Sequence, residues 1–487
     1  GRVPAVSVKM IREGVYIYDM GANMAGVPSV KLQGERGKTA QLRFAEVLCP
    51  DLPEFAGRAG TLMTENLRDA DCTDLYTFSG TKETEEYTPA FTFRGYRYIE
   101  ISGVSRMPGL SEVNMILLSS LKEMQGNVTV SNEMVNRFLD NVKRSQRSNF
   151  IGIPTDCPQR NERMGWNGDT SIFARTATFN ANDRLFYARW LQMTADLQEP
   201  SGRYTDIAPV GGGFGGYTYD SAPLHVTWEV YQQYGDTRVI QDNYAAMERY
   251  MNYSADKWQQ GDLAAPMTLG DWLAPEETDI HLICHAFYGY NAYIMSGMSA
   301  AIGRDPEASA YQKLYLELRR SFNDIYIDAQ SGRTKDHTQC SYALPLSMHM
   351  ISEENLRNVG KCLADKTAET GYLVKSGFFG TAPLNPMLTQ TGHADAAFRL
   401  MEQTDNPSWL YPVTQGATSV WERWDSYTKE KGFGGHNNMN SFNHYSLGAV
   451  CEWFYSYVLG IQRQEDYPGY QHFLIHPCIM VLEHAEG

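Results

Sequence analysis

Apolar and polar residues alternate with a period of two in several short segments before about residue 120. This alternation is typical of strands that have one buried and one exposed face. Gly and Pro separate the segments, for example at Gly21, Gly34 and Pro50, and both residue types favour turns. The clearest segments are residues 6–10, 15–18, 40–44 and 96–101. The pattern predicts a β-sandwich of antiparallel strands.

From about residue 131 the apolar residues recur every three or four positions instead. A typical stripe, which predicts an amphipathic helix, consists of Tyr311, Leu314, Leu318, Phe322 and Ile325. Comparable stretches lie near residues 171–198, 221–234, 238–258, 282–302, 353–367, 391–403 and 440–460. We expect about ten to twelve helices, more than one bundle needs, and a toroid of paired helices would accommodate them.

The changes of period divide the chain into three predicted regions. Residues 1–125 form the β-sandwich, and residues 126–463 form the mainly α domain. Residues 471–477 return to a strand-like pattern, so residues 464–487 are interpreted as the start of a truncated C-terminal β-domain. The native gene product is therefore expected to be longer than this chain.

The charge balance excludes one class of partner and the hydropathy excludes another. With 42 Lys and Arg against 57 Asp and Glu, the net charge is −15, which argues against binding to nucleic acid. No run of 18 apolar residues and no signal peptide is visible, so no membrane partner is expected either. The sequence leaves the oligomeric state open.

Cysteine and aromatic content bear on the chemistry. The eight cysteines are scattered without a CxxC pair, which favours free thiols over a zinc site or a disulfide framework. We therefore expect neither a metal nor another cofactor, although an all-oxygen calcium site would leave no signal in a single sequence. The 30 Tyr, 20 Phe and 9 Trp provide flat rings with polar edges, which suit sugars as well as large cores.

Residues 153–169 concentrate polar groups in a predicted loop. Pro154, Pro158, Gly165 and Gly168 disfavour regular helix there. The loop carries the carboxylates Asp156, Glu162 and Asp169, the cations Arg160 and Arg163, and the ring of Trp166. Long polar loops are often functional, but a local cluster of ion pairs that fixes a turn would explain the same residues.

Three further segments place carboxylates, amides and rings together. Glu422 lies between Trp421 and Trp424, and an indole wall can desolvate a carboxyl group or form an apolar slot for a ring. Residues 437–445 form an amide-rich run that ends in His444 and Tyr445 and suits hydroxyl recognition. Residues 270–272, which end in Trp272, add another turn that combines an acid with a ring. Taken singly, each of these could instead be structural.

Two Trp-flanked acids far apart in the sequence fit glycoside hydrolysis. That reaction needs a proton donor on one side of the glycosidic bond and a second carboxylate on the other. No metal-binding set and no GxSxG motif is present. The glycine run at residues 211–216 lacks the Lys-Ser/Thr of a phosphate loop, which favours a flexible active-site loop.

Residues 156–169, 416–425 and 443–445 closely resemble the bacterial α-L-rhamnosidases of glycoside hydrolase family 78. Residues 18–21, 45–48 and 93–98 resemble the β-sandwich that precedes the catalytic domain in that family, and residues 270–272 and 407–410 match in order. The resemblance covers nearly the whole chain. It implies an (α/α)6 barrel that hydrolyses terminal α-L-rhamnosides with inversion. The partner would be a rhamnose-containing glycoside or polysaccharide. The sequence leaves the compartment unknown, although it favours a soluble protein of the bacterial periplasm or cytoplasm over a membrane protein.

The resemblance also implies roles for single residues. Glu162 would be the general acid, which protonates the leaving oxygen, and Glu422 the general base, which activates water. The residues implied to hold the rhamnose are Asp156, Arg160, Trp166, Asp169, Trp272 and His444, and Trp421 is a further candidate for the wall of the pocket. For inversion the two catalytic carboxyl groups are expected about 6.5–9.5 Å apart.

One departure from the family pattern leaves alternatives open. Members of the family commonly carry Asp where this chain has Asn161, next to the presumed acid, and the missing charge could change activity or sugar preference. An inverting glycosidase for another terminal sugar, such as an α-L-fucoside or α-L-mannoside, would use the same two carboxylates. A carbohydrate-binding protein without turnover would keep the pocket, but it would not need both Glu162 and Glu422.

Overall fold

The structure is a computed structural model that describes residues 1–265, 268–435 and 437–487. The chain divides into two compact units. The β-unit comprises residues 1–122, 140–163 and 415–445, and the helical unit comprises residues 123–139, 164–414 and 446–487. Segments that are hundreds of residues apart in the sequence therefore fold together within each unit.

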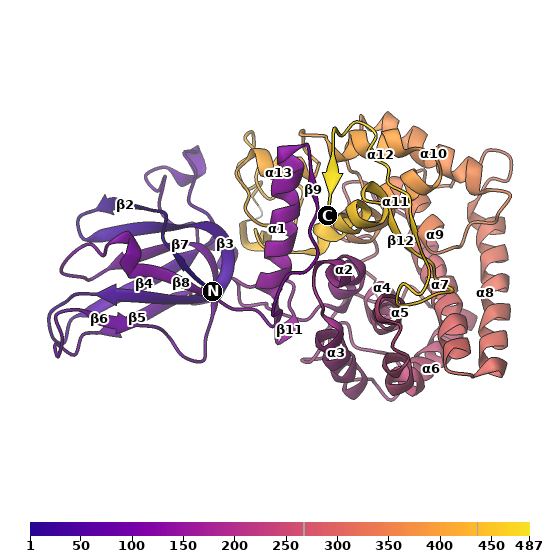
Figure 1. Cartoon of the computed structure of the whole chain (residues 1–487), viewed down its shortest axis with the longest axis horizontal. Coiled ribbons are helices and arrows are strands. Elements are labelled where there is room, and N and C mark those ends of the chain that lie inside the picture. The colour runs from indigo at the N-terminus through magenta and orange to yellow at the C-terminus, as the bar shows by residue number, and fades with distance from the viewer. Residues whose placement is uncertain (266–267, 436) are drawn as a thin grey trace. The chain divides into compact units, whose positions relative to one another are not determined.

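An eight-stranded antiparallel sheet forms the framework of the β-unit (Figure 1). Its strands are β1 (Arg2–Pro4), β2 (Ser7–Arg12), β3 (Val15–Leu32), β4 (Thr39–Ala45), β5 (Thr73–Thr77), β6 (Glu85–Tyr87), β7 (Arg94–Ser102) and β8 (Val113–Leu117). The hydrogen-bonded order is β1-β8-β3-β7-β4-β5, and β2 and β6 also pair with β3. The antiparallel strands predicted from the alternating pattern are confirmed.

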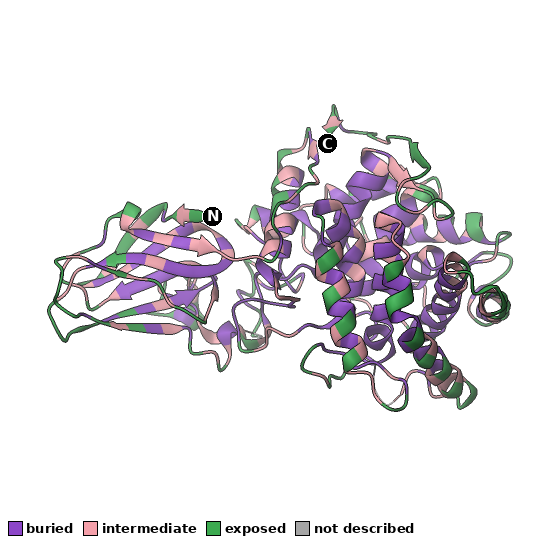
Figure 2. Ribbon diagram, turned by 60° about the horizontal axis from the view of Figure 1, so that its bottom comes forward, coloured by how far each residue is buried: buried purple, intermediate pink, exposed green. Residues whose placement is uncertain are grey.

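Alternation places one face of these strands in a core. Tyr18 lies opposite Ile99, and Leu42 lies opposite Ile101. All four side chains are buried in the same cluster, and the alternation of buried and exposed positions is visible along the strands (Figure 2). The Tyr18 hydroxyl donates to the carbonyl of Pro108 at 2.6 Å, which satisfies the polar end of a buried ring.

Six helical segments of the described chain form a closed ring in the helical unit, in which each contacts the next and the last contacts the first. In ring order they are α2 (Asn167–Asn180), α5 (Ala222–Tyr234), α7 (Ile280–Ala301), α9 (Gln339–Ser347), α11 (Phe378–Gln390) and the run of η5 (Ser446–Val450), α14 (Cys451–Trp453) and η6 (Phe454–Val458). The ring explains why these segments are buried nearly all round: they are enclosed by other helices.

A second layer of helices packs against the outside of this ring. It consists of α3 (Arg184–Asp196), α6 (Arg238–Gln259), α8 (Asp305–Tyr326), α10 (Leu356–Glu369) and α12 (Ala394–Met401). The remaining helices are α1 (Glu133–Asn149), whose first half belongs to the helical unit and second half to the β-unit, α4 (Tyr217–Asp220) and α13 (Leu410–Thr414). Inner ring and outer layer together form the predicted toroid of paired helices.

The predicted stripe on α8 is confirmed at its centre. Leu318 and Phe322 are buried, together with Tyr315, whereas Ile325 is 46% exposed. The buried residues recur every three or four positions, which keeps them on the side of α8 that faces α7. Ile325 lies near the end of the helix, beyond that contact.

Two predicted helices have different limits in the structure. The stretch 171–198 is two helices, α2 and α3, because the chain leaves the helix at residues 181–183. The carboxylate of buried Asp183 accepts a hydrogen bond from Tyr234 there, a polar contact that competes with helix. The stretch 440–460 is helical only from Ser446, because residues such as Asn440, which donates to the carbonyl of Ser426, bind to other loops.

Short strand pairs occur after the last helix. β12 (Ile461–Arg463) pairs with β13 (Phe473–Ile475), and β14 (Ala485–Glu486) pairs with β9 (Thr129–Val130). The predicted strand at residues 471–477 is therefore present in part. None of the helices in the described ranges has the length and apolar character that a membrane crossing requires.

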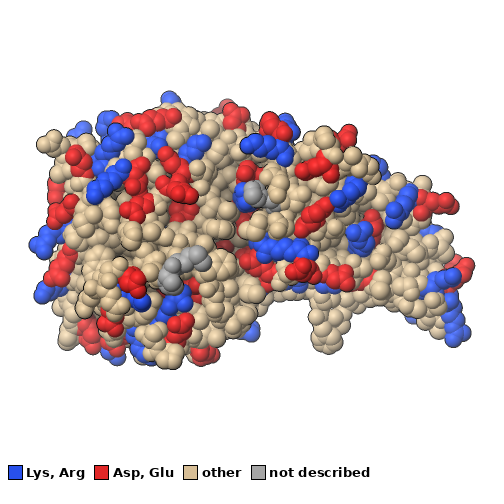
Figure 3. Space-filling model, turned by 180° about the vertical axis from the view of Figure 1, so that it is seen from behind, with Lys and Arg blue, Asp and Glu red and all other residues tan. Residues whose placement is uncertain are grey.

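The state of the thiols follows the prediction from composition, and the surface carries charges of both signs. All eight cysteines are free, and six of them are buried. On the face drawn in Figure 3, Lys and Arg side chains are interspersed with Asp and Glu. A continuous basic stripe, which nucleic-acid binding requires, is not seen on that face.

Candidate active site

The loop predicted for residues 153–169 is present but shorter: it spans residues 155–166, because residues 153–154 belong to a strand and residues 167–169 already belong to the helix that follows. The loop leaves a hairpin of β10 (Phe150–Ile151) and β11 (Ile153–Pro154) and ends where α2 begins. Asp156 and Arg160 are each 2% exposed, whereas the side chain of Glu162 is 17% exposed. Asp156, Arg160 and Glu162 belong to the β-unit, and the chain passes into the helical unit at residue 164.

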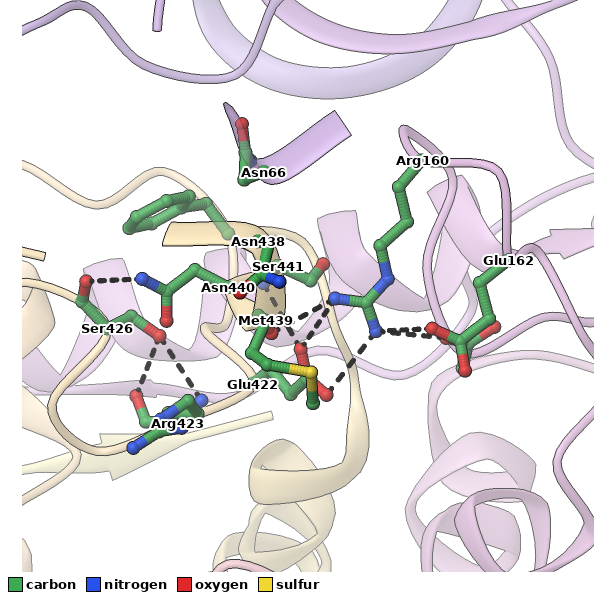
Figure 4. A network of polar contacts seen from close by, with 12 residues as sticks. Asn66, Arg160, Glu162, Glu422, Arg423, Ser426, Asn438, Met439, Asn440 and Ser441 are labelled. Carbon is green, nitrogen blue, oxygen red and sulfur yellow. Dashed lines mark hydrogen bonds and ion pairs between the residues drawn. The ribbon is translucent and has the colours of Figure 1, made fainter. Parts of the chain in front are cut away.

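The guanidinium of Arg160 connects the two carboxylates predicted to be catalytic (Figure 4). Its Nη2 lies 2.8 Å from Oε2 of Glu162 and 3.4 Å from Oε1 of Glu422, and its Nη1 lies 3.0 Å from Oε2 of Glu422. The nearest oxygens of the two carboxylates are thus at most about 6.2 Å apart, slightly less than the separation of about 6.5–9.5 Å expected between the carboxyl groups of an inverting pair. An ion-pair cluster confined to the loop does not describe this arrangement, because Glu422 comes from a distant segment.

Two further acceptors complete the surroundings of Arg160. Nη2 lies 3.5 Å from Oδ2 of Asp156, and Nη1 donates to the carbonyl of Met439 at 3.1 Å. Burial alone lowers the pKa of a guanidinium, but the surrounding acidic groups hold the pKa of Arg160 well above its ordinary value. Arg160 is therefore a permanent cation.

Glu422 is held by a second segment of the β-unit, residues 437–445. The backbone N–H of Glu422 donates to the carbonyl of Ser441 at 3.0 Å, and the N–H of Ser441 donates to Oε2 of Glu422 at 3.1 Å. Glu422 is 4% exposed. The ring of Trp421 packs edge-to-face on Phe442 at 5.4 Å. The role of Trp421 in sugar binding stays a prediction.

His444 lies in the same segment and is 2% exposed. The backbone N–H of His444 donates to the carbonyl of Val420 at 2.8 Å. Burial and the neighbouring positive charge of Arg160 lower the pKa of His444 to about 3, while Glu162 acts in the opposite direction. The imidazole is therefore neutral at any pH where a carboxylate pair operates, and it contributes hydrogen bonds rather than charge.

The flank of Glu162 contains residues that the sequence pattern did not indicate. Arg68 donates from Nη1 to Oε2 of Glu162 at 2.8 Å. Asn161, the departure from the family pattern, donates to Oδ2 of Asp69 at 3.4 Å. No local signal distinguishes Arg68 from other arginines, because its partner lies 94 positions away in the sequence.

The acidic groups near Arg160 were considered as metal ligands. Asp156, Cys157 and Glu162 each place one potential ligand atom within 4.8 Å of the others. Burial raises the pKa of the Cys157 thiol well above its ordinary value, so the thiol is protonated while no metal is bound. Arg160 contacts both carboxylates and supplies the positive charge at this position.

Trp166 and Asp169 lie where α2 begins, in the helical unit. Trp166 is 8% exposed and contacts Phe214 and Tyr219 edge-on, at 5.1 and 5.6 Å between ring centres. Oδ1 of Asp169 accepts a hydrogen bond from the Ser446 hydroxyl at 2.9 Å. A carboxylate in the first turn is favoured by the unpaired N–H groups and the dipole of the helix.

Trp272 is placed by the neighbouring Asp271. Burial raises the pKa of Asp271, while the backbone N–H groups of Gly380 and Gly377, at 2.8 and 2.7 Å, stabilise its charge. The carbonyl of Trp272 accepts from the N–H of Phe378, the first residue of α11. Three backbone N–H groups at the start of α11, those of Gly377, Phe378 and Gly380, thus hold the acid-plus-ring turn.

Aromatic contacts join the beginnings of several ring helices. Tyr219, just before α5, contacts Trp166 and also contacts Phe379 of α11 at 5.7 Å. Phe214 in the glycine run is 51% exposed. Within the helical unit the beginnings of α2, α5 and α11 therefore form one aromatic patch, which sequence inspection missed because its rings are dispersed along the chain.

A cavity of about 360 Å³ lies elsewhere in the helical unit, among the ring helices. None of the residues predicted for the site lines it. Its charged groups are paired, Arg175 with Glu452 at 3.1 Å and Arg463 with Glu229. Paired charges of this kind are the usual way to satisfy buried ions, so the candidate chemistry stays with Glu162 and Glu422.

Comparison with known proteins decides the family. Residues 123–458 match the model of the bacterial α-L-rhamnosidase six-hairpin glycosidase domain, and residues 9–119 match that of the bacterial α-L-rhamnosidase concanavalin-like domain. The chain belongs to the bacterial α-L-rhamnosidase family. The predicted fold class, an (α/α)6 barrel preceded by an antiparallel β-sandwich, is thereby confirmed.

Two relatives and two solved structures place this chain within the family. It is 36% identical to an α-L-rhamnosidase of Streptomyces avermitilis over 98% of its own length and 45% of the relative. A relative from Formosa agariphila is 35% identical over 93% of this chain and 49% of its own. The crystal structure of the Streptomyces enzyme complexed with L-rhamnose superimposes with a TM-score of 0.91 at 35% identity, over 98% of this chain and 45% of that one.

The α-L-rhamnosidase of Dictyoglomus thermophilum also gives a TM-score of 0.91, at 28% identity, over 100% of this chain and 54% of that chain. This member of the family therefore spans about half the length of the relatives it matches.

Gly95 of β7 allows the loop that contains Pro158 to approach the sheet. A Cβ at Gly95 would lie 2.7 Å from Cγ and 2.9 Å from the carbonyl carbon of Pro158. Gly95→Ala should therefore displace the loop and lower the free energy of unfolding by about 1–3 kcal/mol, measured by urea unfolding. The control is Gly109→Ala, where the nearest atom is an ordinary 3.5 Å away. Equal stability of the two variants would contradict the close approach.

Glu46 is a buried carboxylate beneath Glu422. It is 1% exposed and accepts hydrogen bonds from Asn23, Asn66 and the N–H of Phe442, at 2.8, 2.8 and 3.1 Å. Burial raises the pKa of Glu46 to about 7, and the charge of Glu422 adds to this, while the hydrogen bonds from Asn23 and Phe442 and the charge of Arg160 act in the opposite direction. The donors make it an anchor for the segment next to Ser441.

A raised pKa in the folded state makes stability depend on pH. The proton on Glu46 stabilises the fold fully below about pH 4.5, and this contribution is lost as the pH rises through about 7. Between pH 5 and 8 the wild-type protein should thus lose stability relative to Glu46→Gln, by at most about 3 kcal/mol. Urea unfolding of both proteins at four pH values measures the difference. A difference that does not change with pH would show that Glu46 titrates normally.

Proposed function

We propose that this chain hydrolyses terminal α-L-rhamnosides with inversion, with Glu162 as the general acid and Glu422 as the general base. The observation that carries the proposal is the shared contact of both carboxylates with the buried guanidinium of Arg160. Membership of the α-L-rhamnosidase family supports the choice of sugar.

The surroundings of the two carboxylates support this division of roles. The side chain of Glu162 is 17% exposed and that of Glu422 is 5% exposed, so Glu162 is the more accessible to a leaving oxygen. Glu422 accepts hydrogen bonds from Arg160 and from the N–H of Ser441. These donors hold the carboxylate of Glu422 in place, where it can accept a proton from water.

The proposed reaction is the displacement of the leaving oxygen by water at the anomeric carbon. The oxygen of a water molecule attacks the anomeric carbon while the bond from that carbon to the leaving oxygen breaks. Glu162 gives its proton to the leaving oxygen, and Glu422 takes one from the attacking water. Attack from the face opposite the leaving group inverts the anomeric centre, which NMR of the freshly released sugar would record.

The sugar is proposed to be held by acids, a cation, a neutral imidazole and indole rings. Carboxylates and guanidinium groups bind hydroxyls, and a ring can cover the methyl group of a 6-deoxy sugar. The proposed contacts are Asp156, Arg160, Trp166, Asp169, Trp272, Trp421 and His444. His444 is neutral and can donate or accept, according to its tautomer.

The catalytic assignment predicts the effect of two isosteric substitutions. Glu162→Gln and Glu422→Gln should each lower kcat on 4-nitrophenyl α-L-rhamnoside by about 10²–10⁴-fold. The reason is that an amide can act neither as a general acid nor as a general base. Binding of L-rhamnose, measured by calorimetry, and circular dichroism should change little. The control is Glu430→Gln, an exposed glutamate eight residues after Glu422. A near-wild-type rate in either active-site variant would refute the role of that residue.

The sugar is tested on a panel of 4-nitrophenyl α-L-rhamnoside, α-L-fucoside and α-L-mannoside. Clear preference for the rhamnoside is the expected result. Preference for one of the other sugars would leave the roles of the two carboxylates intact but would contradict the assignment of rhamnose as the substrate. Absence of turnover in a protein that binds L-rhamnose would identify a binding protein.

A further inference from the structure

Arg68 has an unusual backbone conformation. It follows the 3₁₀ turn η2 (Glu65–Leu67) and has φ 56° and ψ −123°. This region of backbone space is sparsely populated by residues other than glycine, and such strain persists only where other interactions compensate for it. Positions of this kind concentrate at functional sites.

The side chain of Arg68 supplies the compensating interactions. Nη1 donates to Oε2 of Glu162 at 2.8 Å, Nε donates to the carbonyl of Asn438 at 2.8 Å, and Nη2 lies 3.5 Å from Sδ of Met439. All three nitrogens of the guanidinium are therefore engaged. Arg68 links the loop that carries Glu162 to η4 (Asn437–Met439). The carbonyl of Met439 also accepts a hydrogen bond from Arg160.

The two arginines meet on one oxygen of the proposed acid. Nη1 of Arg68 and Nη2 of Arg160 both lie 2.8 Å from Oε2 of Glu162. A proton on Oε2 would point at these N–H donors and is disfavoured. The proton that a general acid delivers is thereby directed to Oε1.

We propose that Arg68 is a positioning residue for the acid step: it orients the carboxyl group of Glu162 so that Oε1 presents the proton to the leaving oxygen. This inference rests on the proposed function. It assigns to the β-unit a direct part in protonating the leaving group, because Arg68 lies between two strands of the sheet, β4 and β5.

A misplaced general acid has a characteristic kinetic signature. Protonation matters most for poor leaving groups, whereas a leaving group that departs readily as an anion needs little help. Loss of Arg68 should therefore affect aryl rhamnosides in order of the basicity of the leaving group. General damage to the fold would lower all rates by one common factor.

The experiment compares kcat/KM on 2,4-dinitrophenyl, 4-nitrophenyl and phenyl α-L-rhamnoside. Arg68→Met removes the guanidinium at similar length, and Arg68→Gly accepts the positive φ, so at least one variant should fold. We expect a loss below about threefold on the dinitrophenyl substrate and at least about thirtyfold on the phenyl substrate. Arg68→Lys, with one ammonium in place of a fork, should be intermediate.

The control is Arg58→Met, which removes an exposed ion pair to Glu65, at 2.7 Å, in the same connection between β4 and β5. Its leaving-group dependence should equal that of the wild type. An equal loss on all three substrates in the folded Arg68 variants, or no loss, would overturn the positioning role while leaving the proposed function intact. Absence of activity in the wild type on every substrate would overturn the proposed function and this inference with it.

Discussion

The buried guanidinium of Arg160 is the interaction on which the candidate site depends. It is 2% exposed, and it contacts Asp156, Glu162 and Glu422. Removing an ion from water is costly, and only close, well-oriented partners offset that cost. The same contacts bring like-charged carboxylates close together. Without a cation between them, these carboxylates would repel one another. Arg160 thus makes the proposed catalytic pair compatible with folding.

The β-unit is part of this arrangement rather than an appendage. Its sheet bears Glu46 at the end of β4, which holds the N–H of Phe442 one residue after Ser441. Gly95 of β7 lets the backbone at Pro158 approach the sheet. The connection between β4 and β5 provides Arg68. A sheet supports such contacts well because its strands are tied to one another along their length, which keeps these groups in place.

The helical ring positions its own residues by a different means. Each ring helix begins after a loop, and the first turns leave N–H groups without helical partners. Asp271 accepts two of those N–H groups at the start of α11, and Asp169 lies in the first turn of α2. Tyr219 connects the ring of Trp166 to that of Phe379. Because the six helices close on one another, aromatic side chains that are up to about two hundred residues apart in the sequence come together.

The sequence by itself determined the order of β and α structure, a loop within residues 153–169, and the pair of Glu162 and Glu422. These depend on local periodicity, on Gly and Pro, and on motifs that carry a recognisable family pattern. Only the tertiary structure decided that Arg160 joins both glutamates, that Arg68 and Glu46 lie beside them, and that the ring of Trp421 packs on Phe442. The physical reason is that periodicity reports whether a residue is buried, whereas its partner is chosen by how distant segments pack. The helix break at Asp183 is the same case, because its hydrogen bond comes from Tyr234, fifty-one residues later.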